Sequence, residues 1–400
     1  GDIIINGSIA QAAATIDIGA GNLHIKGDYN KTGGVFKTTT GIVTYEGGNA
    51  QVVADVPYYN LSINKTGGIA QLNTTANPTV TGSLAVQQGS LLMQSSEGAP
   101  GTLAVNGNVQ IGASTTSGSL TAANTNINLK GNWGKISGTF SPGTGTVLFT
   151  GTGAQSVSES QFNNLIFGGA AGSVITATGN LTVNGDVTLQ YGKLDLGTYT
   201  MNRSAVGGNL TLASGTSLEL KGENNFPSNY NTNTLHTAST VIYSGAVAQQ
   251  VKALSYGTLA LLGGGDTNVK SLSGTTTVRG DLAIYAGAKL NANNQTLTLH
   301  GNFAVNGSFS PGAYIEGTPP SGTLILGNTA GVIKGISGSS LAVNNMVVSV
   351  GAMYGMALTN LTINGNIDIT GDGNVYSDPD NPNPANRGFL NSSVPNNGFL

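Results

Sequence analysis

GTVLFTGTGAQSVSESQFNNLIF, residues 145–167, recurs in modified form elsewhere in this chain. GIVTYEGGNAQVVADVPYYNLSI, residues 41–63, keeps the same skeleton 104 residues earlier and aligns Gln51 with Gln155. A third copy, TVIYSGAVAQQVKALSYGTLALL, aligns Gln249 with Gln155 at an offset of 94 residues, and GTLILGNTAGVIKGISGSSLAVNNMVV is a degraded fourth. Such repetition is typical of folds in which each unit buries its apolar face against the next unit.

The similarity extends upstream of each copy. LHIKGDYNKTGGVF and INLKGNWGKISGTF align Lys26 with Lys130 and Phe36 with Phe140, again 104 residues apart. LKGENNF and LHGNFAVNGSFSPG continue the series in the second half of the chain. We therefore expect about four imperfect copies of one long unit.

Charge is scarce in this sequence. Only 8% of the 400 residues are charged, the formal net charge is −3, and Gly contributes 61 residues. A soluble domain ordinarily carries about a quarter charged residues, so Thr, Ser, Asn and Gly are expected to cover this surface instead. No cluster of Lys and Arg is present to neutralise phosphates, and we therefore expect no nucleic-acid partner.

The sequence contains no cysteine, which is compatible with a bacterial exterior because a long chain can build its core without disulfides. It has no run of about 18 apolar residues, so we expect no membrane span. No signal peptide is visible at Gly1. If the protein is secreted, we expect this sequence to be its mature part.

Short strands punctuated by turns are predicted along the whole chain. Phrases such as TLAVNGNVQI, NLTVNGDVTL and NLTINGNIDI alternate apolar and polar residues on each side of an Asn-Gly corner, whereas helical periodicity is absent. The corners could be β-hairpins, or they could bend the chain into the next face of a parallel β-solenoid. The solenoid is favoured because strands of three to five residues are too short for freestanding hairpins. Coils of about twenty residues would then make a rod on the order of 90 Å long.

These phrases, together with GNLTVNGDVTLQYGKLDLGTYTM and GTVLFTGTGAQSV…FNNLIF, resemble the β-strand-repeat secreted surface proteins of bacteria, which are adhesin-like or filament-forming. The resemblance covers about residues 20–370 and implies a right-handed parallel β-helix with an extracellular or cell-surface, structural or adhesive role. It brings no catalytic motif. We predict an all-β, parallel β-solenoid over residues 1–370 and a Pro/Asn-rich extension over residues 371–400 that caps the solenoid or pairs with another subunit.

Catalytic constellations are not apparent in the sequence. The eighteen acidic residues are scattered, and the best local pair, Asp186 with Asp195, is expected to lie on solvated strand positions. His24, His236 and His300 lie far apart and lack the spacing of metal ligands. No GxSxG elbow is present. We therefore predict that the protein is not an enzyme and has no cofactor, apart from a weak calcium candidate.

That candidate lies in GDGNVYSDPDNPNPANRG, where Asp372, Asn374, Asp378 and Asp380 supply oxygen ligands at short spacing. Oxygen ligands of this kind are what Ca²⁺ takes in proteins, although the spacing does not match an EF-hand loop. The alternative is a turn or linker rich in Pro and Asn.

Aromatic residues recur at equivalent places in the successive units: Tyr29, Trp133, Phe226 and Phe303. Exposed aromatics could stack on sugar rings and bind cell-surface glycans. Repetition at one structural position favours packing in the core or anchoring of a loop instead.

The two ends of the solenoid are expected to be assembly surfaces, because an unpaired strand edge is a template for another chain. The first residues are strand-like and apolar, and the tail contains two GFL phrases. The predicted assembly residues are Ile3, Ile4, Ile5, Phe389, Leu390, Phe399 and Leu400. We predict a homopolymer built head to tail into a surface filament or fibre. The alternative is an adhesin stalk or glycan-binding module within a larger secreted protein.

Overall fold

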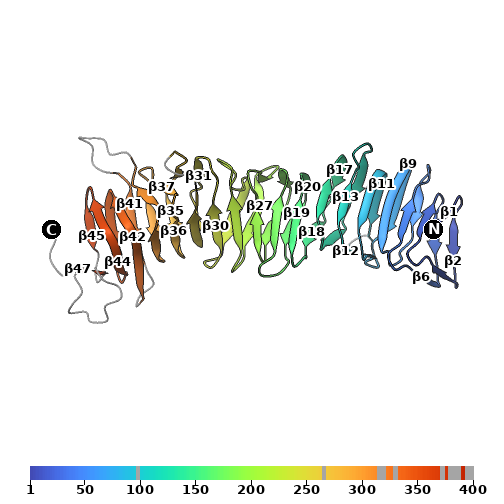
Figure 1. Cartoon of the computed structure of the whole chain (residues 1–400), viewed down its shortest axis with the longest axis horizontal. Helices are drawn as coiled ribbons and strands as arrows, with labels where there is room; N and C mark the ends of the chain where they lie inside the picture. Colours follow the sequence, from blue (N-terminus) through green and yellow to red (C-terminus); the bar gives the residue numbers. More distant parts are fainter. Residues whose placement is uncertain are drawn as a thin grey trace. The chain divides into compact units, whose positions relative to one another are not determined.

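The structure is a computed structural model, and it describes residues 1–95, 100–263, 267–312, 321–327, 332–369, 374–376 and 389–391. Every regular element in these ranges is a β-strand, and the fold is a parallel β-solenoid of about 17 coils (Figure 1). The predicted fold class is therefore confirmed. The chain divides into two compact units: unit 1 comprises residues 1–195, 199–211 and 227–232, and unit 2 comprises residues 196–198, 212–226 and 233–400.

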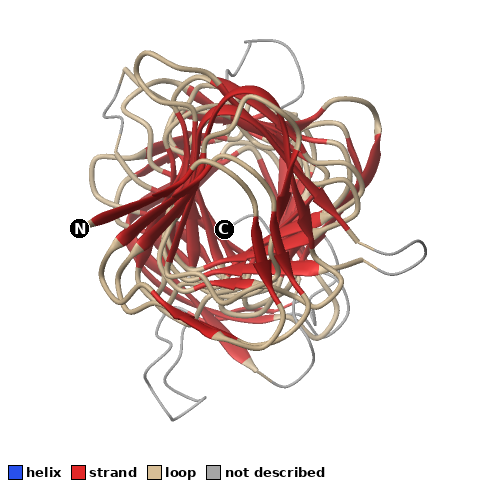
Figure 2. Cartoon of the chain, turned by 90° about the vertical axis from the view of Figure 1, so that its right-hand side faces the viewer, coloured by secondary structure: helices blue, strands red, loops and turns tan. Residues whose placement is uncertain are grey.

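Unit 1 winds through three faces per coil, and strands on each face pair or pack in parallel with those of the next coil (Figure 2). The first face carries β1 (Asp2–Ile5), β4 (Asn22–Ile25), β7 (Ile42–Tyr45), the start of β9 (Asn60–Asn73), the start of β11 (Leu84–Gln94), β13 (Val109–Ile111), β16 (Trp133–Lys135), β19 (Ala154–Val157), β22 (Val174–Ala177) and β25 (Lys193–Asp195). The second face carries β2 (Ile9–Gln11), β5 (Tyr29–Lys31), β8 (Gln51–Val53), the ends of β9 and β11, β14 (Gly118–Thr121), β17 (Gly138–Ser141), β20 (Ser160–Phe162), β23 (Leu181–Val183) and β26 (Met201–Arg203). The third face carries β3 (Thr15–Asp17), β6 (Val35–Lys37), β10 (Thr79–Val80), β12 (Thr102–Val105), β15 (Asn126–Leu129), β18 (Thr146–Phe149), β21 (Asn164–Phe167) and β24 (Val187–Leu189).

Unit 2 repeats this plan, and β27 (Gly207–Leu212) and β29 (Tyr230–Leu235) have residues in both units. Its first face carries β28 (Ser217–Leu220), β30 (Thr240–Tyr243), β33 (Thr258–Leu261), β36 (Leu282–Ile284), β39 (Phe303–Val305), β42 (Ile333–Val343), β44 (Met353–Ile363) and β46 (Asn374–Tyr376). Its second face carries β31 (Gln249–Val251), β34 (Lys270–Leu272), β37 (Lys289–Asn291) and β40 (Ser308–Ser310). Its third face carries β32 (Ser255–Tyr256), β35 (Thr276–Val278), β38 (Leu297–Leu299), β41 (Thr323–Leu326), β43 (Asn345–Val348) and β45 (Ile367–Ile369), and β47 (Phe389–Asn391) pairs with β46.

Alternation along each strand places one set of side chains in the core. Leu23, Val43, Leu61 and Leu84 occupy one register ladder through four coils of unit 1, and all four are buried. Burial of each such side chain is worth about 1.5–3 kcal/mol. The core is therefore a set of stacked apolar ladders, as the period-two pattern predicts.

The Asn-Gly and Lys-Gly corners are bends between one face of the solenoid and the next. The hairpin alternative is wrong for them, because the strands on both sides of a corner pair in parallel with strands of neighbouring coils. At these corners glycine stacks on glycine: a Cβ on Gly131 would lie 2.3 Å from the Gly107 carbonyl oxygen. The residue after the glycine links the coils through its side chain. The Asn108 Oδ1 atom accepts the Asn132 main-chain N–H at 2.8 Å, and the Asn132 Oδ1 atom accepts that of Ser156 at 2.8 Å.

The predicted count of about four long repeats does not describe the structural unit, which is the coil. Register partners in unit 1 lie 20 residues apart between Asp2 and Asn22 and 24 apart between Val109 and Trp133. The offset of 104 residues takes the chain through four coils, from β7 to β16, and then through two further faces to β18. Copy two of the long repeat (residues 127–167) therefore starts on the third face of unit 1, whereas copy one (residues 23–63) starts on the first face.

Candidate functional site

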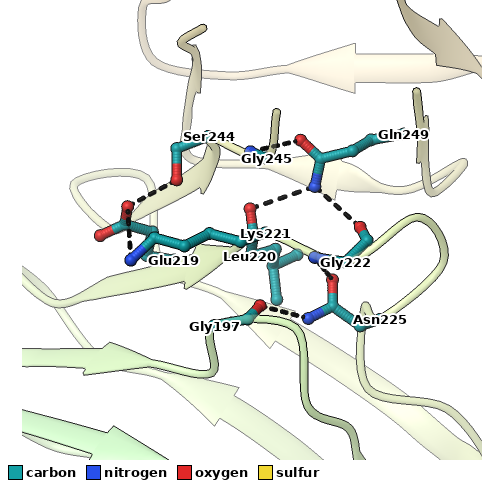
Figure 3. A network of polar contacts seen from close by, with 9 residues as sticks. All are labelled: Gly197, Glu219, Leu220, Lys221, Gly222, Asn225, Ser244, Gly245 and Gln249. Carbon is teal, nitrogen blue, oxygen red and sulfur yellow. Dashed lines mark hydrogen bonds and ion pairs between the residues drawn. The ribbon is translucent and has the colours of Figure 1, made fainter. Parts of the chain in front are cut away.

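The residues that the long repeats preserve are those that fasten one coil to the next. Gln51 lies in copy one, Gln155 in copy two and Gln249 in copy three, which spans residues 220–262. Their carboxamides make the same set of hydrogen bonds to main-chain groups. In unit 2, Gln249 Oε1 accepts the Gly245 N–H at 2.8 Å, and Nε2 donates to the Leu220 and Gly222 carbonyls at 3.1 and 2.8 Å (Figure 3). One carboxamide thus joins its own loop to the corner of the preceding coil.

The other two glutamines repeat this geometry in unit 1. Gln51 bonds to Gly47, Ile25 and Gly27, and Gln155 bonds to Gly151, Leu129 and Gly131 through the same atoms. All three carboxamides are buried. The sequence alignment had marked these glutamines as equivalent, and the structure shows the physical reason.

Copy four (residues 299–348) has lost the glutamine, and a tyrosine from a later coil takes its place. The Tyr354 hydroxyl lies 3.0 Å from the Leu299 carbonyl oxygen and 3.2 Å from that of Gly301, which are the counterparts of Leu220 and Gly222. It also lies 3.1 Å from the Gly327 carbonyl oxygen. The degraded sequence of copy four therefore retains a polar link at this corner by another route.

The network around Gln249 extends along the surface of unit 2 (Figure 3). Asn225 accepts the Gly222 N–H at 3.1 Å and donates to the Gly197 carbonyl at 2.8 Å. The Ser244 hydroxyl donates to Glu219 at 2.5 Å, and the Lys221 ammonium lies 3.5 Å from the same carboxylate oxygen. These side chains bind protein groups of the same network.

Two lysines are buried beside the glutamine loops. The Lys65 ammonium donates to the Gly47 and Asn49 carbonyls, each at 2.7 Å, and to Gln51 Oε1. The Lys270 ammonium donates to the Gly245 carbonyl and to that of Val247 at 3.1 Å. Burial lowers the pKa of both ammonium groups, that of Lys270 to about 8. Sequence reasoning missed these lysines, although alternation in Leu61-Ser62-Ile63-Asn64-Lys65 assigns Lys65 to the core face.

The four aromatic residues that recur at equivalent places in the units pack in the core. Tyr29, Trp133, Phe226 and Phe303 are all buried, so none of them presents a ring to a sugar. The Trp133 indole donates to the Ser160 hydroxyl at 2.8 Å and stacks edge-on against Phe140 at 4.6 Å. These rings therefore act in packing.

The titratable candidates lie apart. His24 Nδ1 lies 3.1 Å from Glu46 Oε2, His236 Nδ1 accepts the Ala238 N–H at 3.0 Å, and His300 lies beside Gly327. Asp186 accepts the Asn209 N–H at 2.8 Å and belongs to a corner ladder. Within the described ranges no three His, Asp or Glu side chains are close enough together to hold a metal ion.

The calcium candidate falls largely where the structure gives no description. Asp372, Asp378 and Asp380 lie outside the described residues, and Asn374 opens β46.

The predicted assembly residues are placed in part. Ile3 and Ile4 are 45% and 59% exposed, and Ile5 is half-buried. Phe389 and Leu390 lie in β47, whose backbone pairs antiparallel with β46 opposite Tyr376 and Val375. Phe399 and Leu400 lie outside the described residues.

Comparison of the chain with protein-family models, with curated proteins and with solved structures finds no match. In the part of the chain that the structure describes, no helix has the length and apolar character needed to cross a bilayer.

Proposed function

We propose that this chain is a non-enzymatic extracellular structural protein, a subunit that assembles head to tail into a surface filament or fibre. The observation that carries the proposal is the identity of the repeated residues. Gln51, Gln155 and Gln249 and the glycine corners recur because they fasten coil to coil. What the copies repeat are residues that hydrogen-bond one coil to the next, and a chain built in this way is suited to bearing load.

The low charge of the chain favours association between copies. With 8% charged residues and a net charge of −3, neighbouring copies repel one another only weakly. The resemblance to bacterial β-strand-repeat surface proteins agrees with secretion and with an adhesin-like or filament-forming role.

The assembly contact is proposed at β1. Ile3 and Ile5 stand in register with the buried residues Leu23 and Ile25, so they continue two core ladders. Within the described residues β1 pairs with β4 alone, and a strand from a second copy would extend its ladder and bury the exposed Ile3 side chain. A contact between two different surfaces of identical subunits leads to a linear polymer.

Sedimentation velocity of the purified chain over a range of concentrations tests this assembly. We expect species that grow with concentration, and we expect the variant Ile3→Lys to remain monomeric because the contact would bury its charge at the end of a core ladder. Val206→Lys is the matched control, since Val206 is another apolar residue of unit 1 and is 76% exposed. A wild-type chain that stays monomeric at every concentration would refute head-to-tail assembly.

A further inference from the structure

The outward surface of the first face of unit 1 contains a groove of about 370 Å³ between copy one and the following coil. It is lined by His24 on β4, by Ile42, Thr44 and Glu46 on and after β7, by Asn60, Leu61, Ser62 and Asn64 on β9, and by Ser83, Ala85 and Gln87 on and before β11. The register explains its shape. Thr44, Ser62 and Ala85 form a central row of small side chains, because strand pairing places them side by side in successive coils.

Longer side chains flank this central row on both sides. Glu46, Asn64 and Gln87 follow it by two residues along their strands, and Ile42 and Asn60 precede it by two. Side chains two residues apart in a strand project from the same face. The groove therefore runs across the strands, from coil to coil.

Copy two provides an internal comparison, since it follows the same strand plan on the third face of unit 1. Leu148 and Ile166 stand there at the positions of Thr44 and Ser62 and are paired side by side in the same way. Both are half-buried, outward-facing apolar residues. The substitution of a leucine and an isoleucine by two hydroxyl residues is thus what hollows this face in copy one.

The groove presents polar groups that protein atoms do not occupy. Thr44 and Ser62 are only 8% and 7% exposed, yet their hydroxyls make no hydrogen bond within the described part of the chain. The side chains of Asn64 and Gln87 make none there either. Hydroxyl and carboxamide groups held in this way can both donate to and accept from a ligand.

The main chain beneath the groove is not available to a ligand, because β4, β7, β9 and β11 pair with strands of the coils on both sides. An extended peptide recognised by strand addition needs a free strand edge, which this face lacks. The occupant must carry its own donors and acceptors and must tolerate a nearly uncharged wall.

Glu46 and His24 form the charged end of the groove. Their Nδ1 and Oε2 atoms lie 3.1 Å apart, and both side chains remain about one-quarter exposed. A carboxylate fixed by a neighbouring imidazole is a strong acceptor for a ligand hydroxyl. Ile42 and Ala85 add apolar contact area on the opposite side and on the floor.

We propose that this groove binds a neutral saccharide chain, with Thr44, Ser62, Asn64 and Gln87 bonding to its hydroxyls and Glu46 accepting from one of them. A polyhydroxylated ligand matches a wall of hydroxyls and carboxamides that lacks a free strand edge. The site is independent of head-to-tail assembly, because β1 supplies none of its lining residues.

The test is binding of the full chain to immobilised neutral oligosaccharides: glucans of α and β linkage, xylan, mannan and N-acetylglucosamine oligomers. The variant Thr44→Leu/Ser62→Ile carries the residues of copy two, which the same strand plan already accommodates. We expect it to keep the wild-type unfolding midpoint and to lose at least about tenfold in affinity. Leu148→Thr/Ile166→Ser, the reverse exchange in copy two, is the matched control and should leave binding unchanged.

Asn64→Ala and Glu46→Gln are second variants that leave the floor of the groove intact, and each should weaken binding several-fold. Binding of no saccharide in the panel by the wild-type chain would overturn the proposal. So would saccharide binding that Thr44→Leu/Ser62→Ile leaves unchanged, or binding that requires a charged peptide or a metal ion in place of the sugar. Failure of the sedimentation test of assembly would not affect this result.

Discussion

Tyr45 and Tyr58 face each other in the core of unit 1 with their hydroxyl oxygens 3.0 Å apart. The Tyr58 hydroxyl donates to the Ala54 carbonyl at 2.7 Å, and the Tyr45 hydroxyl accepts the Ala54 N–H at 3.1 Å. Tyr45 must therefore donate to Tyr58, which closes a cycle of three hydrogen bonds through the N–H and the carbonyl of one residue, Ala54. Unit 2 builds the same cycle from Tyr243, Tyr256 and Lys252.

Replacement of Tyr45 by Phe opens this cycle. It leaves the buried Ala54 N–H without its acceptor and removes the hydroxyl that donates to Tyr58, so we expect a loss of about 1–3 kcal/mol in the free energy of unfolding. The double variant Tyr45→Phe/Tyr58→Phe should cost less than the sum of the single variants, because each single variant already breaks the hydrogen bond between the two hydroxyls. A double-mutant cycle by urea unfolding measures this coupling, and strictly additive costs would argue against a cooperative cycle.

The buried tyrosines predict a sharp alkaline limit to stability. Burial raises the pKa of Tyr29 and of Tyr243 from 10.0 to about 12. Burial also raises the pKa of Tyr45, Tyr58 and Tyr256 well above its usual value. A group whose pKa is raised on folding contributes stability that is complete below its unfolded value and is lost as pH rises toward its folded value. Stability should therefore fall steeply above about pH 10.

The buried ammonium of Lys270 has the opposite effect on the pH dependence of stability. Its pKa is lowered from 10.5 to about 8 on folding, so its contribution to stability rises with pH between these two values. Unfolding followed by tyrosinate absorbance and by circular dichroism checks the alkaline limit. Ionisation of these tyrosines near pH 10 without loss of structure would contradict the account.

We expect the Gln249 side chain to contribute more to the free energy of unfolding than an exposed polar side chain does. The variant Gln249→Ala removes the Gln249 partner of the Gly245 N–H and the Gly222 carbonyl, and it leaves the Leu220 carbonyl with the Ser244 N–H alone. We expect it to cost about 2–3 kcal/mol in the free energy of unfolding. Gln249→Glu should cost at least as much, because a carboxylate would face the Leu220 and Gly222 carbonyl oxygens. The adjacent exposed residue supplies the control, Gln250→Ala, for which thermal unfolding should be unchanged. Equal thermal unfolding midpoints for the two alanine variants would show that the hydrogen bonds of the Gln249 carboxamide do not stabilise the contact between coils.

Glycine corners give a paired test within unit 1. A Cβ on Gly131 would meet the Gly107 carbonyl at 2.3 Å, whereas a Cβ on Gly153 would meet nothing within 4 Å. We expect Gly131→Ala to destabilise the chain by about 1–3 kcal/mol through overpacking, and Gly153→Ala to be neutral or slightly stabilising. Chemical unfolding of the two variants side by side measures the difference, and an equal effect would mean that the stacked corners tolerate a side chain.

Much of the fold follows from local sequence, because a solenoid is built from contacts between neighbouring coils. Alternation assigns Leu23 and Val43 to the core, and the Asn-Gly phrases locate the bends. The equivalence of Gln51, Gln155 and Gln249 is readable from the offsets of 104 and 94 residues. What a corner glutamine binds is not readable, since its carbonyl partners come from a coil of variable length.

Features that depend on the face of a coil were beyond sequence reasoning. His24 and Glu46 meet because a coil of 20 residues brings β4 beside β7, and the sequence shows only two distant polar residues. Tyr354 replaces a glutamine from outside copy four, so no alignment of the copies could reveal it. The groove at Thr44 and Ser62 can be recognised only once the strand register shows that these two residues lie side by side, as Leu148 and Ile166 do in copy two.

Electron microscopy of the purified full chain at physiological salt, without added ligand, tests the central claim most directly. The account predicts linear fibres formed by the protein alone, because the core ladders that continue through Ile3 and Ile5 would be covered by a second copy. Dispersed single particles under the same conditions would contradict the assignment as a filament subunit.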